Sequence, residues 1–326
     1  MRRVTDRKRV LVTRAIPKVG LELLEGAGYE VEINPDDRPY TREEFLEKVA
    51  GREGVVCMLH DPIDDAVLDA ATDAKIFSNF AVGYNNIDLA ACRGRGVRVT
   101  NTPGVLTDAT ADLAFCLLLA TARRVVETDA YLREGKFRGW APLLLLGADV
   151  TGKTLGIVGP GRIGKAVAER AKGFRMRILY SGRSSEPPHP DWEALGAEKV
   201  KMEELLSEAD FVSIHCPLTE ETRHLIGDAE FARMKSSAIL INTARGPIVD
   251  EAALVRALAD GEIAGAGLDV FEEEPRLAPG LADLPNTVLL PHLGSSTHAT
   301  RDAMARLAAE NLIAVLEGRE PAYAVV

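Results

Sequence analysis

Three stretches in the second half of the chain place polar residues directly after apolar runs that are typical of strands. Arg245 follows "AILINT", Asp269 and Glu272–Glu274 follow "AGAGL", and His292 follows "TVLLP". Ligands of open α/β sheets bind at the carboxyl ends of strands, so we expect these side chains to share one site. An arginine can hold a substrate carboxylate, a histidine can donate a proton to a carbonyl oxygen, and a neighbouring carboxylate keeps that histidine charged. This combination favours hydride reduction of a 2-oxo acid.

A glycine-rich turn is the candidate site for the hydride carrier. Gly159, Gly161 and Gly164 form a G-x-G-x-x-G pattern between the apolar run "TLGIV" and a helix-like stretch that begins at Arg162 and Ile163. Such glycines permit a tight turn, a close approach of the backbone to a pyrophosphate and close packing of helix on strand. The pattern alone is weak, but a strand precedes it and another, "RILY", follows its helix. We therefore interpret it as a dinucleotide site and not as an ordinary glycine turn.

The residues after "RILY" bear on which dinucleotide binds. A site for NAD usually presents an acid to the adenine ribose there, whereas this chain has Ser181, Gly182, Arg183 and Ser184, and no acid before Glu186. A guanidinium can bind a 2′-phosphate bidentately, and a carboxylate would repel it. We predict that NADP(H) is preferred and that NAD(H) is possible. In the alternative interpretation Arg183 is an ordinary loop arginine and NAD binds through other contacts.

The bulk composition restricts the class of protein. The chain has 326 residues, of which 46% are apolar and 27% charged, and its formal net charge is −10. These values are typical of a globular protein with two domains, and the acidic charge argues against a nucleic-acid partner. The N-terminal "MRRVTDRKR" is interpreted as a solvated tail without a signal peptide, and the longest apolar run, "LAFCLLLA", is too short to span a membrane. The four cysteines lack paired or metal-ligand spacing, so we predict free thiols, no metal and a cytoplasmic protein.

Strand-like and helix-like segments alternate along the whole chain. The strands of a first series are "RVLVT", "YEVEI", "GVVCML" and "KIFSNF". A long helical segment is predicted from about Thr107 to Leu132, and a second series follows with "TLGIVG", "RILY", "DFVSIHC", "AILINT", "AGAGLDV" and "TVLLP". The last helix is "HATRDAMARLAAENLIAVLEG", which has one apolar face. The alternation predicts an α/β fold with two doubly wound units, each on a mostly parallel sheet.

Taken together, these motifs resemble those of the D-isomer-specific 2-hydroxyacid dehydrogenases, most closely the glyoxylate and hydroxypyruvate reductases. The resemblance covers essentially the whole chain and rests on "GPGRIG", "HCPLTEETRHLI", "LINTARGPIVDE", "AGAGLDVFEEEP" and "VLLPHLGSST". It implies that NADPH or NADH reduces glyoxylate to glycolate and hydroxypyruvate to D-glycerate. It also implies two Rossmann-like domains, with the cofactor domain inserted into a flavodoxin-like substrate domain.

The resemblance assigns roles to individual residues. Arg245, Glu274 and His292 match the catalytic arginine, glutamate and histidine of the family. The motifs above and the resemblance together give these candidate cofactor-binding residues: Thr107, Gly159, Gly161, Arg162, Ile163, Gly164, Ser181, Gly182, Arg183, Ser184, Cys216, Pro217, Thr222, Thr243, Ala244, Asp269 and Gly294. The positions that match substrate-binding residues are Leu59, His60, Val82, Gly83, Trp140, Arg245 and His292. Many relatives have serine in place of His60, which puts the preferred substrate size in doubt.

The resemblance further implies a discontinuous arrangement of domains. Residues 1–103 with 293–326 would bind the small 2-oxo or 2-hydroxy acid, and residues 104–292 would bind the cofactor. A homodimer is implied, with a dimerisation helix and its extension in residues 104–146. Within that extension, Trp140 lies where related reductases have a tryptophan that reaches the partner's active site. An equally open interpretation makes it a core or interface aromatic without a part in catalysis.

Several alternatives stay open. A D-2-hydroxyacid dehydrogenase of the phosphoglycerate or 2-ketogluconate type would share these motifs, whereas a phosphite or formate dehydrogenase fits "VFEEEP" and "PHLGS" less well. Some members of the family have become dinucleotide-sensing co-repressors, and these can keep the same triad. Among the other polar residues, we predict a structural hydrogen bond for His215, a surface or loop position for His224, and solvated side chains for Glu272 and Glu273.

Overall fold

The computed structural model describes residues 7–182 and 190–326. The chain divides into two compact units, of which the first comprises Met1–Leu106 and Ser295–Val326 and the second Thr107–Gly294. The second unit thus interrupts the first in the sequence. Helices alternate with parallel strands in both units, which confirms the predicted α/β class with two Rossmann-like units, one inserted into the other.

The described residues of the first unit form a five-stranded sheet in the order β2-β1-β3-β4-β5, and every strand pair is parallel. Its strands are β1 (Arg9–Val12), β2 (Glu30–Ile33), β3 (Gly54–Cys57), β4 (Ile76–Asn79) and β5 (Arg98–Thr100). This is the strand order of flavodoxin-like sheets. β5 was not predicted, because Val99 is the only apolar residue among its three, whereas the equally short β12 lies in the longer apolar run "TVLLP".

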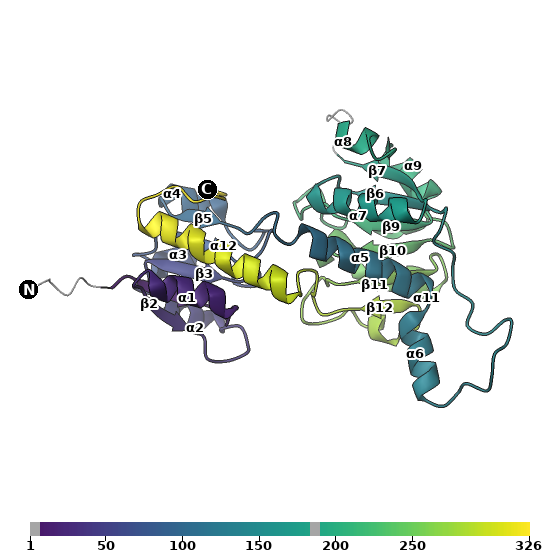
Figure 1. Cartoon of the computed structure of the whole chain (residues 1–326), viewed down its shortest axis with the longest axis horizontal. Coiled ribbons are helices and arrows are strands. Elements are labelled where there is room, and N and C mark those ends of the chain that lie inside the picture. Colours follow the sequence, from purple (N-terminus) through teal and green to yellow (C-terminus); the bar gives the residue numbers. More distant parts are fainter. Residues whose placement is uncertain (1–6, 183–189) are drawn as a thin grey trace, which may run out of the picture. The chain divides into compact units, whose positions relative to one another are not determined.

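The helices of the first unit are α1 (Lys18–Gly26), α2 (Arg42–Val49), α3 (Asp65–Ala70), α4 (Leu89–Gly94) and α12 (His298–Leu316). The last helix of the chain, α12, packs against α1 and crosses β3, β4 and β5 (Figure 1). Gly20 permits this close packing, since a Cβ there would lie 2.8 Å from the carbonyl oxygen of Ala305. The chain therefore returns from the second unit to complete the core of the first.

The described residues of the second unit form a seven-stranded parallel sheet in the order β12-β11-β10-β9-β6-β7-β8. Its strands are β6 (Thr154–Val158), β7 (Arg177–Ser181), β8 (Glu198–Lys199), β9 (Phe211–Ile214), β10 (Ile239–Asn242), β11 (Gly265–Leu268) and β12 (Thr287–Leu289). The strand order reverses between β6 and β9. At such a switch point an open α/β sheet binds its ligand, outside the carboxyl ends of the strands.

Both faces of the second sheet are covered by helices. One core lies between the sheet and the helices α5 (Thr107–Ala122) and α7 (Arg162–Gly173), and the other involves α9 (Met202–Glu208), α10 (Asp228–Phe231) and α11 (Glu251–Ala259). Successive strand residues such as Ile239 and Leu240 point into opposite cores. The short elements are α8 (Pro190–Glu193), η1 (Gly246–Ile248) and η2 (Leu281–Asp283). Apolar side chains on both faces explain why these strands read as nearly continuous apolar runs.

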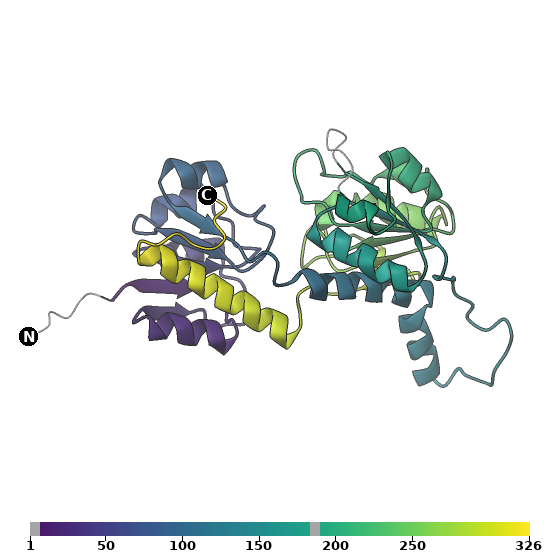
Figure 2. The same ribbon diagram turned by 45° about the horizontal axis from the view of Figure 1, so that its top comes forward.

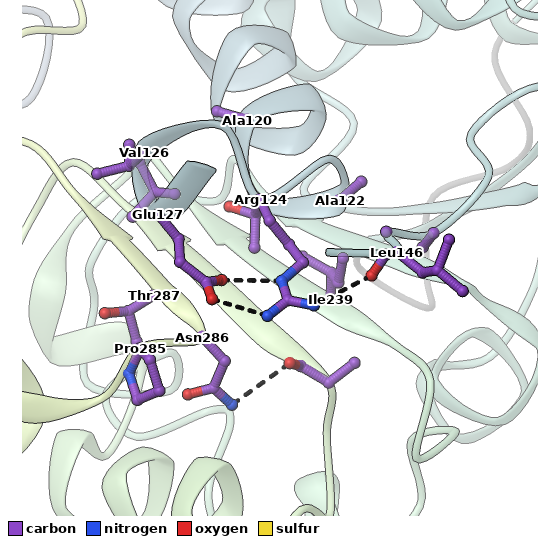
Figure 3. A pocket seen from close by; sticks show the side chains of 15 residues that line it. Ala120, Ala122, Arg124, Val126, Glu127, Leu146, Ile239, Pro285, Asn286 and Thr287 are labelled. Atoms are coloured by element: carbon purple, nitrogen blue, oxygen red, sulfur yellow. Dashed lines mark hydrogen bonds and ion pairs between the residues drawn. The ribbon is translucent and has the colours of Figure 1, made fainter. Parts of the chain in front are cut away.

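The single long helix predicted from Thr107 to Leu132 is wrong, because the structure breaks it into α5 and α6 (Val125–Arg133). Arg124 stands between them in the left-handed region, with a φ of 54°. Its guanidinium pairs with the carboxylate of Glu127 at 2.7 and 2.8 Å and donates to the carbonyl oxygen of Leu146 at 3.2 Å (Figure 3). After the break, α6 and the following loop extend away from the rest of the second unit (Figures 1 and 2).

Candidate active site

The glycine-rich turn joins β6 to α7 and leaves no room for a side chain at two of its glycines. Gly159 has a φ of 98°, and a Cβ there would lie 2.3 Å from the backbone nitrogen of Cys216. A Cβ at Gly164 would lie 2.5 Å from the carbonyl oxygen of Gly159. Since Cys216 follows β9, the turn lies at the switch point between β6 and β9.

Helix α7 begins at the same turn. Its N-cap is Gly161, so no side chain caps the first-turn N–H groups, and its first residues are the exposed Arg162 and the half-buried Ile163. The first N–H groups of a helix have no partner within the helix, and the helix dipole favours negative charge at this end. The turn and α7 therefore fit the pyrophosphate of a dinucleotide.

The end of β7 lies beside this turn. Ser181 is the last residue of β7, and its carbonyl oxygen accepts a hydrogen bond from the N–H of Gly159 at 2.9 Å. A Cβ at Gly182 would lie 2.7 Å from the ring of Pro160. Arg183 and Ser184, on which the NADP prediction depends, lie outside the described residues. The chain thus leaves β7 next to the turn, where the adenine ribose of a dinucleotide is read.

The loop after β9 contains three of the predicted cofactor residues, Cys216, Pro217 and Thr222. The hydroxyl of Thr222 donates to the carbonyl oxygen of Pro217 at 2.7 Å and so fixes the shape of this loop. His215 and Ser213 are hydrogen-bonded at 2.8 Å. Burial lowers the pKa of His215 to about 3 and raises the pKa of Cys216 to about 11. Neither side chain therefore carries charge near neutral pH.

The loop after β10 contains a buried polar atom that suits a bound ligand. The hydroxyl of Thr243 is buried and has no hydrogen-bond partner among the described residues. Buried hydroxyls are nearly always paired, so a bound molecule is the natural partner. The side chain of Asn242 folds the loop: it accepts from the N–H of Ala244 and donates to the carbonyl oxygen of Arg245, both at 3.0 Å.

Asp269, which follows β11, anchors the loop that carries His292. Its two carboxylate oxygens accept the N–H groups of Leu293 at 2.6 Å and of Gly294 at 2.7 Å. A Cβ at Gly294 would lie 3.3 Å from Asp269 Oδ2, so the loop fits closely over the carboxylate. Burial raises the pKa of Asp269 above its ordinary value, although these N–H groups and the charge of His292 oppose the shift.

His292 and Glu274 form a hydrogen-bonded pair at the ends of β12 and β11. Nδ1 of His292 lies 3.0 Å from Oε2 and 3.2 Å from Oε1 of Glu274, and Oε1 also accepts the N–H of Phe271 at 3.1 Å. Burial acts to raise the pKa of Glu274, but the hydrogen bond and charge of His292 and the N–H of Phe271 hold this pKa below its ordinary value. Glu274 is therefore charged, and it orients the imidazole.

Arg245 lies beside this pair. Its guanidinium donates from Nη1 to the carbonyl oxygen of Ala244 at 2.8 Å. Burial lowers the pKa of Arg245, and the charge of Glu274 opposes that shift; a guanidinium still stays charged. Arg245, Glu274 and His292 thus follow three adjacent strands, β10, β11 and β12. The structure brings together a cation suited to a carboxylate and a histidine–carboxylate pair suited to proton transfer.

Two predicted substrate residues, Val82 and Gly83, lie in the loop after β4 of the first unit. The carbonyl oxygen of Val82 accepts a hydrogen bond from the side chain of Asn101 at 2.7 Å, and that of Gly83 accepts from Asn79 at 2.8 Å. Both asparagines are buried. They hold the loop from the ends of β4 and β5. This supporting role was not predicted; the signal for Asn79 was an asparagine within the strand-like run "KIFSNF".

Two more predicted substrate residues of the first unit, Leu59 and His60, follow β3. Nε2 of His60 lies 3.6 Å from Oδ1 of Asp61, which is buried. Asp61 also accepts the N–H of Met58 at 2.7 Å and the hydroxyl of Thr13 at 2.5 Å. The position of His60 is therefore supported by a fixed carboxylate, and Asp61 was not predicted.

Thr107 and Trp140 lie elsewhere in the second unit. Thr107 is the first residue of α5. Trp140 belongs to the extended segment after α6, and 85% of its surface is exposed. Seven of the twelve exposed large apolar side chains in the described part of the chain lie on α6 or this segment: Val125, Val126, Leu132, Phe137, Trp140, Leu143 and Leu146.

A hollow of about 320 Å³ is separate from this site (Figure 3). Ile239 and Thr287, the first residues of β10 and β12, line it together with Arg124 and Glu127. It therefore lies at the amino ends of the strands, whereas Arg245 and His292 lie beyond the carboxyl ends. Within the described ranges no group of His, Cys, Asp and Glu side chains could hold a metal ion, and no helix could span a membrane.

The prediction of solvated side chains is wrong for Glu272 and correct for Glu273. Oε1 of Glu272 lies 2.5 Å from Nε2 of His224, which is therefore paired, and the N–H of Glu272 donates to Glu251 at 2.6 Å. The Glu272 side chain is 25% exposed, whereas that of Glu273 is 71% exposed. Three consecutive glutamates look alike in the sequence, and only the packing of the loop distinguishes them.

Comparison with known proteins agrees with this geometry. Residues 115–294 match the model of the family described as D-isomer specific 2-hydroxyacid dehydrogenase, NAD binding domain. The glyoxylate reductase of Thermococcus litoralis is 52% identical over 317 residues, which cover 96% of this chain and 95% of the relative.

Solved structures agree as well. The TT0316 protein of Thermus thermophilus is 50% identical, with a TM-score of 0.91 over 98% of this chain and 100% of that one. The NADPH-dependent glyoxylate/hydroxypyruvate reductase of Sinorhizobium meliloti, solved with NADP and malonate, is 34% identical, with a TM-score of 0.85 over 98% of this chain and 97% of that one. The protein is therefore an oxidoreductase that belongs to the D-isomer-specific 2-hydroxyacid dehydrogenase family, near its glyoxylate reductases.

Proposed function

We propose that the protein is an NADPH-preferring reductase that converts glyoxylate to glycolate and hydroxypyruvate to D-glycerate. The observation that carries this proposal is the His292–Glu274 pair, which lies with Arg245 at the same sheet edge as the glycine-rich turn. Relatives named glyoxylate reductase support the substrate class. The Sinorhizobium meliloti enzyme, named for NADPH, supports the cofactor.

The proposed mechanism gives each side chain one task. When bound, the reduced nicotinamide supplies a hydride to the 2-oxo carbon. Arg245 holds the substrate carboxylate and polarises the carbonyl group. Because Nδ1 of His292 faces Glu274, Nε2 is the nitrogen that gives a proton to the carbonyl oxygen. Glu274 stabilises the charged imidazole and fixes its orientation.

The same proposal assigns the cofactor contacts. Gly159, Gly161, Gly164 and the start of α7 would hold the pyrophosphate, and Arg183 the 2′-phosphate. The close contact of Gly159 with Cys216 and the unpaired hydroxyl of Thr243 fit a bound dinucleotide. The remaining cofactor assignments stay predictions, as do those of Leu59, His60, Val82, Gly83 and Trp140 to the substrate.

We also propose that the protein is a homodimer and works in the cytoplasm. Seven exposed large apolar side chains occur on α6 and the following segment. This supports a dimer, since exposed apolar surface of such extent commonly marks an interface. A partner over this segment would shield Trp140. All four cysteines are free, which supports a reducing compartment.

A panel of 2-oxo acids tests the proposal. Initial rates would be measured with glyoxylate, hydroxypyruvate, pyruvate and 2-ketogluconate, each with NADPH and with NADH. We expect the highest kcat/KM for glyoxylate or hydroxypyruvate with NADPH. A best rate with 2-ketogluconate would point to the alternative dehydrogenase type, and a clear preference for NADH would refute the cofactor assignment. No turnover of any acid, together with a tight peptide partner in a pull-down, would favour a co-repressor.

A further inference from the structure

A buried carboxylate outside the proposed catalytic set holds the loop that carries Glu274. Glu251 is the first residue of α11, and only 4% of its surface is exposed. Its Oε1 accepts the N–H of Glu272 at 2.6 Å. Burial, with the charges of Glu272 and Glu274, raises the pKa of Glu251, and backbone N–H groups of the loop oppose that shift. The Glu251 side chain therefore holds the loop Phe271–Ala278 at Glu272, two residues before Glu274.

The side chain of Glu272 extends this network to a third segment. Its Oε2 accepts the N–H of Glu251 at 3.4 Å, and its Oε1 lies 2.5 Å from Nε2 of His224. The N–H of His224 in turn donates to the carbonyl oxygen of Pro247 at 2.8 Å. The loop with Glu274, the start of α11 and the segment of His224 are thus connected by hydrogen bonds.

The loop with Arg245 is part of the same assembly. A Cβ at Gly246 would lie 1.9 Å from the carbonyl carbon of Phe271, so the two backbones are in direct contact. Arg245 immediately precedes this contact, and Phe271 donates its N–H to Glu274. A displacement of the loop Phe271–Ala278 would therefore change the position of Glu274 relative to both His292 and Arg245.

Capping of α11 does not account for Glu251. An acid in the first turn of a helix is common because it favours the helix dipole. In α11, however, Asp250 is already the N-cap, and its carboxylate accepts the N–H of Ala253 at 2.9 Å. The carboxylate of Glu251 instead accepts a backbone N–H of another segment, that of Glu272, and burying a charge is costly unless such donors satisfy it.

We infer that Glu251 is a positioning residue: with Glu272 and His224, it holds the loop Phe271–Ala278 in the register that places Glu274 against His292. This inference rests on the proposed function, in which Glu274 and His292 take part in catalysis. Charged groups that act on His292 are Glu274, which is hydrogen-bonded to it, and Asp269; Arg245 acts on Glu274. Glu251 changes the reaction through the geometry of Glu274.

Two conservative variants separate geometry from charge. Glu251→Asp keeps the charge and the helix start but withdraws the carboxylate from the loop. Glu251→Gln keeps the length and one acceptor oxygen but removes the charge. We expect kcat of Glu251→Asp to fall about 100-fold, as for a catalytic group displaced by about 1 Å, with an unchanged KM for NADPH. We also expect the alkaline loss of activity in its pH profile to begin at a lower pH than in the wild type, because Glu274 no longer supports the charged imidazole.

Glu251→Gln should keep most of the wild-type kcat and its pH profile, as should the control Glu273→Gln, a change of the exposed glutamate in the same loop. The inference is wrong if Glu251→Gln loses as much activity as Glu251→Asp, or if Glu251→Asp keeps its kcat or loses it equally at every pH. Should Glu251→Asp fail to fold, His224→Ala decides. It removes the contact between His224 and Glu272, and it should move the alkaline loss of activity to lower pH as well.

Glu274→Gln distinguishes this inference from the proposed function. If Glu274→Gln leaves kcat and the pH profile unchanged, then the proposed catalytic role of Glu274 is wrong and the role of Glu251 falls with it. If Glu274→Gln lowers kcat and shifts the profile while Glu251→Asp does neither, then only the positioning role is wrong.

Discussion

Nδ1 of His292 lies 3.0 Å from Oε2 of Glu274, although the two residues are 18 positions apart. They meet because β11 and β12 are adjacent and parallel, so the loops after both strands leave the same edge of the sheet. Asp269 holds the loop of His292 through two backbone N–H groups, and Glu251 holds the loop of Glu274. Each member of the pair therefore has its own buried carboxylate as an anchor.

Glu274→Gln should lower kcat about 100-fold, within the range for groups that assist proton transfer. The amide removes the negative charge that favours the charged imidazole, so the alkaline decline in activity should move to lower pH. Because the pKa of Glu274 lies below its ordinary value, the wild-type carboxylate stays charged until the pH falls below the range of an ordinary glutamate. Rates of NADPH oxidation at several pH values test this, with Glu273→Gln as the control; equal profiles for both variants would contradict it.

His292→Gln and Arg245→Ala should each lower turnover by about 10²- to 10⁴-fold, since one removes the proton donor and the other the cation for the substrate carboxylate. The fold should survive, because neither side chain belongs to the apolar cores. Single-turnover kinetics and circular dichroism would measure both effects. His298→Gln, a change of an exposed histidine at the start of α12, is the matched control. Activity near the wild-type level in either test variant would overturn the mechanism.

Local patterns predicted the glycine turn and ten of the twelve strands in the described part of the chain, and missed the short strands β5 and β8. The run before Gly159 is apolar because both faces of β6 are covered. The glycines of the turn are required where backbones touch: Gly159 lies against the backbone of Cys216, and Gly164 lies against the carbonyl oxygen of Gly159. The apolar pattern of a covered strand and the spacing of glycines in a tight turn involve residues that are close together in the chain, so both are visible in the order of residues. The contact of Gly159 with Cys216 joins the ends of two different strands and is not visible in this way.

Interactions between distant segments were not visible in this way. Arg124 breaks the predicted helix through contacts with Glu127 and with the carbonyl oxygen of Leu146, while the apolar pattern continues past the break. Glu251 and Glu272 are ordinary glutamates in the sequence, and 21 positions separate them. Their roles depend on how α11 packs against the loop after β11, and packing of this kind leaves no periodic pattern.

Leu143→Glu combined with Leu146→Glu should convert the proposed dimer to a monomer. Both side chains are more than half exposed, at 81% and 61%, and a charge on a surface that a partner buries is costly. Sedimentation velocity would compare the variant with Tyr323→Glu, which places the same charge on an exposed aromatic residue of the first unit. A monomeric wild-type protein, or a variant that stays dimeric, would contradict the proposed interface.

Asp210→Asn should lower the free energy of unfolding at neutral pH by about 1 to 3 kcal/mol, as expected for hydrogen bonds to a charged group. Asp210 accepts the N–H of Thr154 and the ammonium of Lys235, each at 2.9 Å. Burial acts to raise the pKa of Asp210, but these two hydrogen-bond partners hold it below its ordinary value. Its contribution is therefore fully present above the unfolded-state pKa of about 3.9, and it is lost as the pH falls through the lower folded-state pKa. Urea titrations should show the difference between wild type and variant shrinking only below about pH 4; a constant difference would refute this.

Arg183→Ala should lower kcat/KM for NADPH about 10- to 100-fold, because a bidentate contact with a phosphate contributes about 1.5 to 3 kcal/mol. The rate with NADH should change little, since NADH lacks the 2′-phosphate. Arg183 lies outside the described residues, but Ser181 and Gly182 leave β7 beside the glycine turn, through the bond from Gly159 and the contact with Pro160. Arg177→Ala removes the same charge at the other end of β7, where the guanidinium pairs with Glu198 and Glu208. An equal loss with both cofactors, or an equal effect of Arg177→Ala, would show that Arg183 does not read the phosphate.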